Sequence, residues 1–95
     1  MIVKITDVAR LQYQSIYDYI LARFGYKIAE EFDQKVLELI IYLENFPKIG
    51  IPQASRKNLY GIHLSTQTRV FYILEDKNIV IVAFSDNRKQ IKISL

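Results

Sequence analysis

The chain has 95 residues, of which 51% are hydrophobic and 24% charged, and its formal net charge is +3. These values indicate one globular domain over residues 1–95 and exclude a disordered or fibrous chain. The absence of cysteine excludes disulfides and cysteine-bound zinc, and the single histidine excludes a metal site with several histidine ligands. No apolar run is long enough for a membrane span or a signal peptide, so we expect a cytoplasmic protein with no membrane contact, no metal and no small-molecule cofactor.

The first half of the chain predicts a short strand followed by two helices. Residues 2–5 are mostly β-branched and predict a strand, after which Thr6 or Asp7 can cap a helix. Apolar residues spaced three or four apart form the stripe of a first helix, namely Ala9, Tyr13, Ile16, Ile20 and Phe24. A second stripe consists of Ala29, Phe32, Val36, Leu39, Ile40 and Leu43. Gly25 ends the first helix and Pro47 follows the second, so the short link predicts a helical hairpin.

The second half of the chain changes to the pattern of strands. Residues 47–52 contain two prolines and Gly50, and they predict a loop. Three β-rich runs follow, at residues 59–64, 69–74 and 79–84. Polar links of about four residues join them, which predicts an antiparallel β-meander. The alternation of apolar and polar residues at 91–95 predicts either an extra strand or a loose tail.

Together these elements predict the order β-α-α-β-β-β. This is an α+β fold with the helical hairpin on one face of a four-stranded antiparallel sheet and residues 2–5 at the sheet edge. The helices can cover only one face, yet both sides of the run 69–74 are apolar, since Phe71 and Ile73 alternate with other apolar residues. We therefore expect the second face to be covered by a binding partner, by a second copy of the chain or by residues 91–95.

The charges are distributed unevenly along the chain. Residues 56–95 carry seven basic and three acidic residues, whereas residues 1–55 carry six basic and seven acidic ones. The basic half indicates either a surface for a polyanion or acidic partner or ordinary solubilising charge. The acids of the second helix are interpreted as its solvent-facing side rather than as paired catalytic carboxylates; they are Glu30, Glu31, Asp33 and Glu38.

Three residues of the predicted meander could carry chemistry: His63, Arg69 and Arg88. An imidazole titrates near neutral pH, and guanidinium groups bind phosphate oxygens. Metal-free RNA cleavage needs a base for the 2′-OH, cations for the phosphorane charge and an acid for the leaving oxygen, which these three could supply. The alternative interpretation is a surface histidine with two arginines that solvate the sheet rim. We expect Arg69 and Arg88 to be neighbours at one rim, joined there by His63, because the third strand begins and the fourth strand ends at that end.

The loop before Arg69 decides whether that residue and His63 share a face of the sheet. A four-residue loop pairs His63 with Val70, which puts His63 and Arg69 on opposite faces. A three-residue loop, at 65–67, pairs Leu64 with Thr68 and, with a bulge, lets His63 and Arg69 align. The sequence leaves both registers open.

An ordered set of segments resembles the RelE/ParE superfamily of bacterial type II toxins. The matching segments are residues 16–20, 46–50, 59–64, 69–74 and 79–89. The resemblance covers nearly the full length, and it implies a helical hairpin on a meander and a cognate antitoxin that wraps the toxin.

The superfamily resemblance implies two possible activities. In the ParE-like branch the toxin blocks DNA gyrase and is not a nuclease, and the arginines are surface and fold residues. In the RelE-like branch the toxin cleaves mRNA on the ribosome; Arg69 and Arg88 match its arginines, and His63 could replace a base. We interpret the chain as a growth-inhibiting toxin of the ParE type, the alternatives being a RelE-like mRNA endonuclease or an inactive interaction module. Under the RelE-like alternative alone, His63, Arg69 and Arg88 are the expected catalytic residues.

Overall fold

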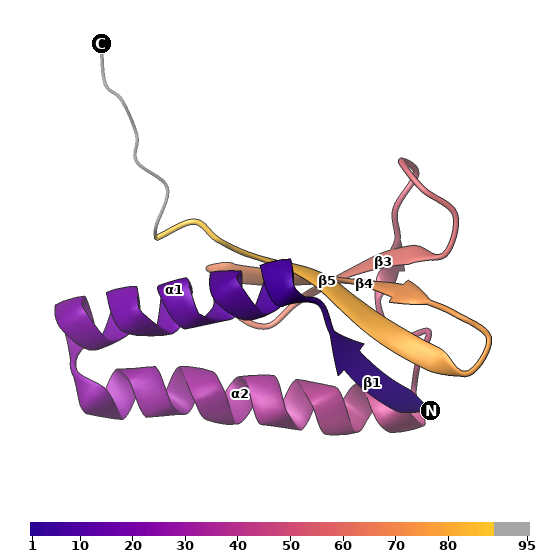
Figure 1. Cartoon of the computed structure of the whole chain (residues 1–95). Coiled ribbons are helices and arrows are strands. Elements are labelled where there is room, and N and C mark those ends of the chain that lie inside the picture. Colours follow the sequence, from indigo (N-terminus) through magenta and orange to yellow (C-terminus); the bar gives the residue numbers. More distant parts are fainter. Residues whose placement is uncertain (89–95) are drawn as a thin grey trace, which may run out of the picture.

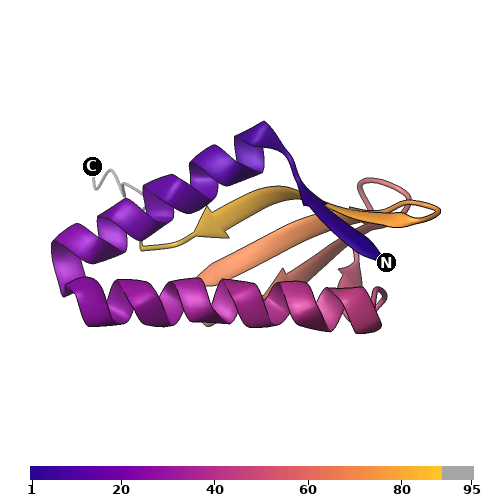
Figure 2. The same cartoon turned by 60° about the horizontal axis from the view of Figure 1, so that its bottom comes forward.

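Two helices and five strands make up the computed structural model, which describes residues 1–88 (Figure 1). In chain order the elements are β1 (Ile2–Ile5), α1 (Asp7–Phe24), α2 (Tyr26–Asn45), β2 (Ile51–Pro52), β3 (Leu59–His63), β4 (Thr68–Leu74) and β5 (Asn78–Asp86). The predicted α+β architecture is confirmed, with both helices on one face of the sheet (Figure 2). Residues 91–95, for which the sequence predicts a strand or a tail, lie outside the described residues.

The sheet differs from the prediction in its strand number and in the direction of one edge strand. Its order is β1-β5-β4-β3-β2, and β1 pairs with β5 in parallel, so the sheet is mixed rather than antiparallel throughout. The helical hairpin explains the parallel pair. It returns the chain to the end of the sheet where β1 begins, and the Met1 ammonium donates a hydrogen bond to the carbonyl of Glu44 there at 3.3 Å. Strands β3 and β5 then run in the same direction as β1 (Figure 1).

The additional strand, β2, lies in the segment 47–52, which the sequence predicts as a loop. Ile51 pairs with Gly61, and Pro52 pairs with Tyr60, so two residues of the segment form the edge strand β2. Proline is tolerated at an edge because its missing N–H removes no bond inside the sheet.

Capping residues fix the helical hairpin. The Thr6 hydroxyl accepts a hydrogen bond from the Ala9 N–H at 3.1 Å, which confirms Thr6 as the cap of α1. Gly25 joins the helices at φ 91°, in a region that favours glycine, and α2 begins at the next residue. Neither helix of the described residues has the length and apolar character needed to cross a membrane.

The core lies between the helices and the sheet face that they cover. Its fully buried side chains include Ile20, Leu43, Val70, Tyr72, Ile79 and Ile81. Tyr72 also anchors the segment before β2: its hydroxyl accepts a hydrogen bond from the Gly50 N–H at 3.0 Å and donates one to the Pro47 carbonyl at 2.8 Å. A glycine is required at position 50, because a Cβ there would lie 2.9 Å from that hydroxyl and 3.1 Å from the Gly61 carbonyl oxygen.

Tyrosine–carboxylate hydrogen bonds join the two helices. The Tyr17 hydroxyl donates to Glu30 at 2.5 Å, and the Tyr13 hydroxyl donates to Asp33. The bond to Glu30 raises the pKa of Tyr17 to about 12. Burial, followed by the bond to Asp33, raises the pKa of Tyr13. Two of the four acids interpreted as the solvent-facing side of the second helix therefore bind α1.

The sheet face away from the helices, here called the outer face, carries apolar side chains. The strand register places Ile51, Leu59, Phe71, Ile73 and Val80 on it. Ile51 is 65% exposed. No segment of residues 1–88 covers this face (Figure 1), so the prediction that a partner, a second copy or residues 91–95 covers it stays a prediction.

Candidate functional site

His63 and Arg69 are direct cross-strand neighbours on β3 and β4. The connection is the three-residue loop 65–67, in which the Leu64 N–H donates to the Thr68 carbonyl at 2.9 Å. Of the two registers that the sequence leaves open, the structure has the one that puts His63 and Arg69 on the same face. The expected bulge is not needed here; the irregularity of the sheet lies between β4 and β5 instead.

The Arg69 side chain is exposed on the outer face of the sheet. Its guanidinium carbon lies 4.8 Å from the ring centroid of Phe71, a distance that allows a cation–π interaction. Gly61 on the neighbouring strand provides the space for this pair. A Cβ at Gly61 would lie 3.3 Å from Arg69 Nη2, 3.1 Å from Phe71 Cε1 and 2.9 Å from Gln53 Nε2. Arg69 is thus a cation that an incoming anion or protein surface can reach.

Arg88 is bound to a buried carboxylate. Its Nη2 donates to Asp86 Oδ2 at 2.7 Å, its Nε donates to Oδ1 at 3.1 Å, and its backbone N–H donates to Oδ1 at 2.8 Å. The Thr68 hydroxyl donates to the same carboxylate at 2.5 Å. Burial of Asp86 raises the pKa of its carboxyl group, but the hydrogen bonds from Arg88 and Thr68 outweigh this effect and hold the pKa below its ordinary value.

The two arginines share one end of the sheet but not one face. Thr68 pairs with Asp86, and Arg69 pairs with Ser85, so the start of β4 lies beside the end of β5. Arg69 and Arg88 therefore lie at the same end of the sheet, as expected. Thr68 and Asp86 are buried, on the side of the helices, and the Arg88 guanidinium joins them there. The structure therefore brings His63 and Arg69 together on the outer face and separates Arg88 from them.

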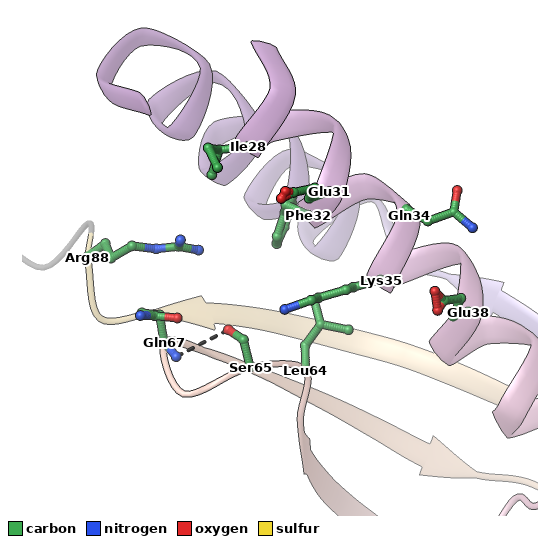
Figure 3. A pocket seen from close by; sticks show the side chains of 10 residues that line it. All are labelled: Ile28, Glu31, Phe32, Gln34, Lys35, Glu38, Leu64, Ser65, Gln67 and Arg88. Carbon is green, nitrogen blue, oxygen red and sulfur yellow. Dashed lines mark hydrogen bonds between the residues drawn. The ribbon is translucent and has the colours of Figure 1, made fainter. Parts of the chain in front are cut away.

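A cavity of about 340 Å³ lies between α2 and the sheet end at Arg88 (Figure 3). Arg88 points into it from the end of β5, toward Ile28 and Phe32 of α2 (Figure 3). Glu31, Lys35 and Glu38 of the same helix contribute charges of both signs, and Leu64, Ser65 and Gln67 line the sheet side. Among residues 1–88, no group of three His, Cys, Asp or Glu side chains could hold a metal ion.

The cluster of Thr68, Asp86 and Arg88 is not predicted from the sequence. The strand pattern ends at residue 84, whereas β5 extends to Asp86 and so turns this carboxylate toward the core. An acid two residues before an arginine is a weak local signal for such a pair. The partner Thr68 becomes visible only when the register of β4 and β5 is known.

Comparison with known proteins gives a family and several structural relatives. Residues 3–91 match the model of a family described as ParE toxin of type II toxin-antitoxin system, parDE. The fold is similar to a structure of the chromosomal ParDE toxin-antitoxin system from P. aeruginosa, with a TM-score of 0.76 and 20% identity over 90% of this chain and 95% of that chain. No curated protein matches in sequence.

Toxins with other names have the same fold. The match to the YoeB dimer from Staphylococcus aureus has a TM-score of 0.61 and 16% identity, and covers 90% of this chain and 94% of that chain. The match to the E. coli DinJ-YafQ complex has a TM-score of 0.61 and 14% identity, and covers 95% of this chain and 97% of that chain. At these identities the structures establish the fold, while the family model covers most of the sequence. The chain belongs to the ParE toxin family of type II toxin-antitoxin systems.

Proposed function

We propose that the chain is a growth-inhibiting toxin that binds and blocks DNA gyrase, and that a cognate antitoxin neutralises it. Membership of the ParE toxin family supports this proposal, because the ParE-like branch of the superfamily blocks gyrase. The observation that carries the proposal is the pairing of Arg88 with Asp86 on the helix side of the sheet. This pairing removes one of the two arginines that a nuclease site was expected to use.

The chemistry of RNA cleavage argues for the same conclusion. A metal-free reaction needs a base, an acid and cations that face the same phosphate. At this end of the outer face the two candidate groups are one imidazole, on His63, and one guanidinium, on Arg69. Moving Arg88 to that face would leave the buried carboxylate of Asp86 without its cation, which is energetically costly. A binding protein needs no such set of groups.

A ribosome-dependent mRNA endonuclease is the second candidate. The observation in its favour is the cross-strand pairing of His63 with Arg69, which puts an acid–base group beside an exposed cation. Under this alternative His63 and Arg69 would be catalytic, and Arg88 would hold the sheet end in place.

The apolar outer face supports a protein partner such as the antitoxin. The apolar residues of this face lie on several strands, and no segment of residues 1–88 covers them. Ile51 is exposed and the other apolar side chains of this face are half-buried, and an apolar surface of this kind favours binding of a partner. Antitoxin binding would remove this area from water, and the energy gained would stabilise the complex.

The two candidate functions are separated by two assays on the purified chain. We expect inhibition in a gyrase supercoiling assay and no cleavage of mRNA in a translating ribosome system. The His63→Ala variant is the control, because a gyrase inhibitor does not need an imidazole base there. We expect it to inhibit supercoiling as strongly as the wild-type chain.

Cleavage of mRNA by the wild-type chain, lost in His63→Ala, would contradict the gyrase proposal and establish the nuclease. The absence of both activities in a folded protein that still binds the antitoxin would leave the inactive interaction module. Circular dichroism confirms folding in each case.

A further inference from the structure

The closed end of the helical hairpin extends past the sheet (Figures 1 and 2). It bears exposed apolar side chains. We call residues 19–28, where α1 ends and α2 begins, the hairpin tip. Its apolar side chains are exposed to different degrees: Leu21 39%, Phe24 50%, Tyr26 68% and Ile28 39%. Four large apolar side chains on a projecting element favour contact with another molecule, because exposure to water is costly for them.

The charged residues of the hairpin tip itself are both basic. Between Asp18 and Glu30 the only charged residues are Arg23 and Lys27. Neither base forms an ion pair within residues 1–88. Arg23 instead lies over the Tyr19 ring, with its guanidinium carbon 5.8 Å from the ring centroid.

Two of the three acids nearest to the tip on α2 are hydrogen-bonded to α1, and the third, Glu31, is exposed and lines the cavity at Arg88. Glu30 accepts a hydrogen bond from Tyr17, and Asp33 accepts one from Tyr13, so both carboxylates face α1. Their charge is therefore directed into the hairpin rather than toward the tip. Within residues 19–28, the surface left to a partner combines two cations with four exposed apolar side chains.

This combination fits an acidic protein surface better than a nucleic acid. Binding to a phosphate backbone depends on many cations and is lost quickly in salt, and the tip has two. Aromatic and aliphatic side chains with a basic residue at their edge are typical of the centre of protein interfaces. A projecting shape fits a recess in a larger partner.

We propose that the hairpin tip is the element by which the chain enters an acidic, apolar-lined recess of its target enzyme. This inference rests on the proposed function, in which the target is DNA gyrase. It assigns target binding to the helices and leaves the apolar outer face of the sheet to the antitoxin. The two partners would then contact different parts of the chain.

The test is a charge reversal at the tip, Arg23→Glu with Lys27→Glu. We expect inhibition of supercoiling and direct binding to purified gyrase to weaken by about tenfold or more, because the cations would become acids opposite an acidic surface. The matched control is Arg56→Glu with Lys57→Glu, on the exposed loop at the opposite end of the molecule (Figures 1 and 2). This control changes the net charge by the same amount and should alter inhibition by less than about twofold.

Lys27→Glu alone is a second variant, chosen because it should leave the fold intact. It adds an acid to the first turn of α2, where a negative charge stabilises the helix. We expect this variant to melt like the wild-type chain and to inhibit less. A third variant, Tyr26→Ala, removes apolar area without changing charge and should also weaken inhibition.

Three results would contradict the proposed role of the hairpin tip in target binding. If the folded tip variants inhibit as strongly as the wild-type chain, the inference is wrong while the proposed function stands. If they keep inhibition but lose the antitoxin, the tip is an antitoxin contact and the inference is again wrong. If the wild-type chain itself does not inhibit gyrase, the proposed function fails, and the inference fails with it.

Discussion

Arg69 and Arg88 occupy the same end of the sheet, yet their surroundings differ. Arg69 is exposed on the outer face, with its guanidinium over the ring of Phe71. Arg88 is on the helix side, where the buried carboxylate of Asp86 holds it by several hydrogen bonds. The cause is the alternation of side chains along β4: Thr68, one position before Arg69, faces the helices and meets Asp86.

The comparison shows that the partners of a residue, and not its type, decide what it can do. A guanidinium that neutralises a buried carboxylate is not free to bind a phosphate, because the carboxylate would be left unpaired. A guanidinium that rests on an aromatic ring at the surface can leave it at small cost. Arg88 therefore contributes to the stability of the fold, whereas Arg69 is exposed and free of a buried partner.

The largest effect is expected from Asp86→Ala. This change leaves the Arg88 guanidinium without its carboxylate and removes the acceptor for the Thr68 hydroxyl. Asp86 is 5% exposed, so we expect the free energy of unfolding to fall by about 3 kcal/mol. Urea unfolding measures this loss. Asp76→Ala, an exposed acid in the turn before β5, is the control and should change stability by less than about 0.5 kcal/mol. Equal effects of the two variants would contradict a structural role for the Arg88 pair.

A second prediction uses the pH dependence of the same pair. The pKa of Asp86 in the folded chain is below its ordinary value of 3.8, so the unfolded chain takes up the proton first as the pH falls. The pair contributes its full stabilisation at pH values above the ordinary pKa of the carboxyl group. This stabilisation is lost as the pH falls toward the lower pKa of Asp86 in the folded chain. We expect the free energy of unfolding of the wild-type chain to fall more steeply below about pH 4 than that of Asp86→Asn. Urea titrations from pH 5 to pH 3 measure the two slopes, and parallel slopes would contradict a lowered pKa of Asp86 in the folded chain.

Helix periodicity and turn residues predicted most of the fold because these signals are local. The Thr6 cap, the Gly25 junction and the apolar stripes of both helices are each contained in a few neighbouring residues. The parallel pairing of β1 with β5 was missed, since it joins segments far apart in the chain. Strand β2 was missed because two residues with a proline carry no strand pattern.

The candidate site was predicted only in part, for a related reason. The sequence identified His63 and Arg69, but the length of the loop between them decides their face, and both lengths were compatible with the residues. It could not predict the Arg88 pair, because that pair needs β5 to extend to Asp86 and β4 to lie in one particular register. Local patterns give the residue types, while long-range register decides which of them meet.

Gly61→Ala tests how closely the side chains around Arg69 pack on the outer face. The added Cβ would lie close to the ends of the Gln53 and Arg69 side chains, which can move, and to the edge of the Phe71 ring. We expect a loss of about 1 kcal/mol in the free energy of unfolding. Gly50→Ala should cost more, about 2 to 3 kcal/mol, since its Cβ would meet a backbone carbonyl and the buried Tyr72 hydroxyl. The reverse order in urea unfolding would contradict this account of the two glycines.

The smallest effect on stability is expected from Arg69→Ala. It removes one exposed cation–π contact and no buried partner, so the free energy of unfolding should fall by about 0.5 kcal/mol. Its effect on activity separates the two candidate functions. A gyrase inhibitor that binds through the hairpin tip should lose less than about twofold in inhibition, because a single exposed charge away from the contact acts only weakly, through the rate of association. A nuclease should lose cleavage of mRNA altogether, because the guanidinium that stabilises the phosphorane charge is gone. Urea unfolding of the same preparation shows that either outcome reflects function rather than folding, since Arg69 contributes so little to the core.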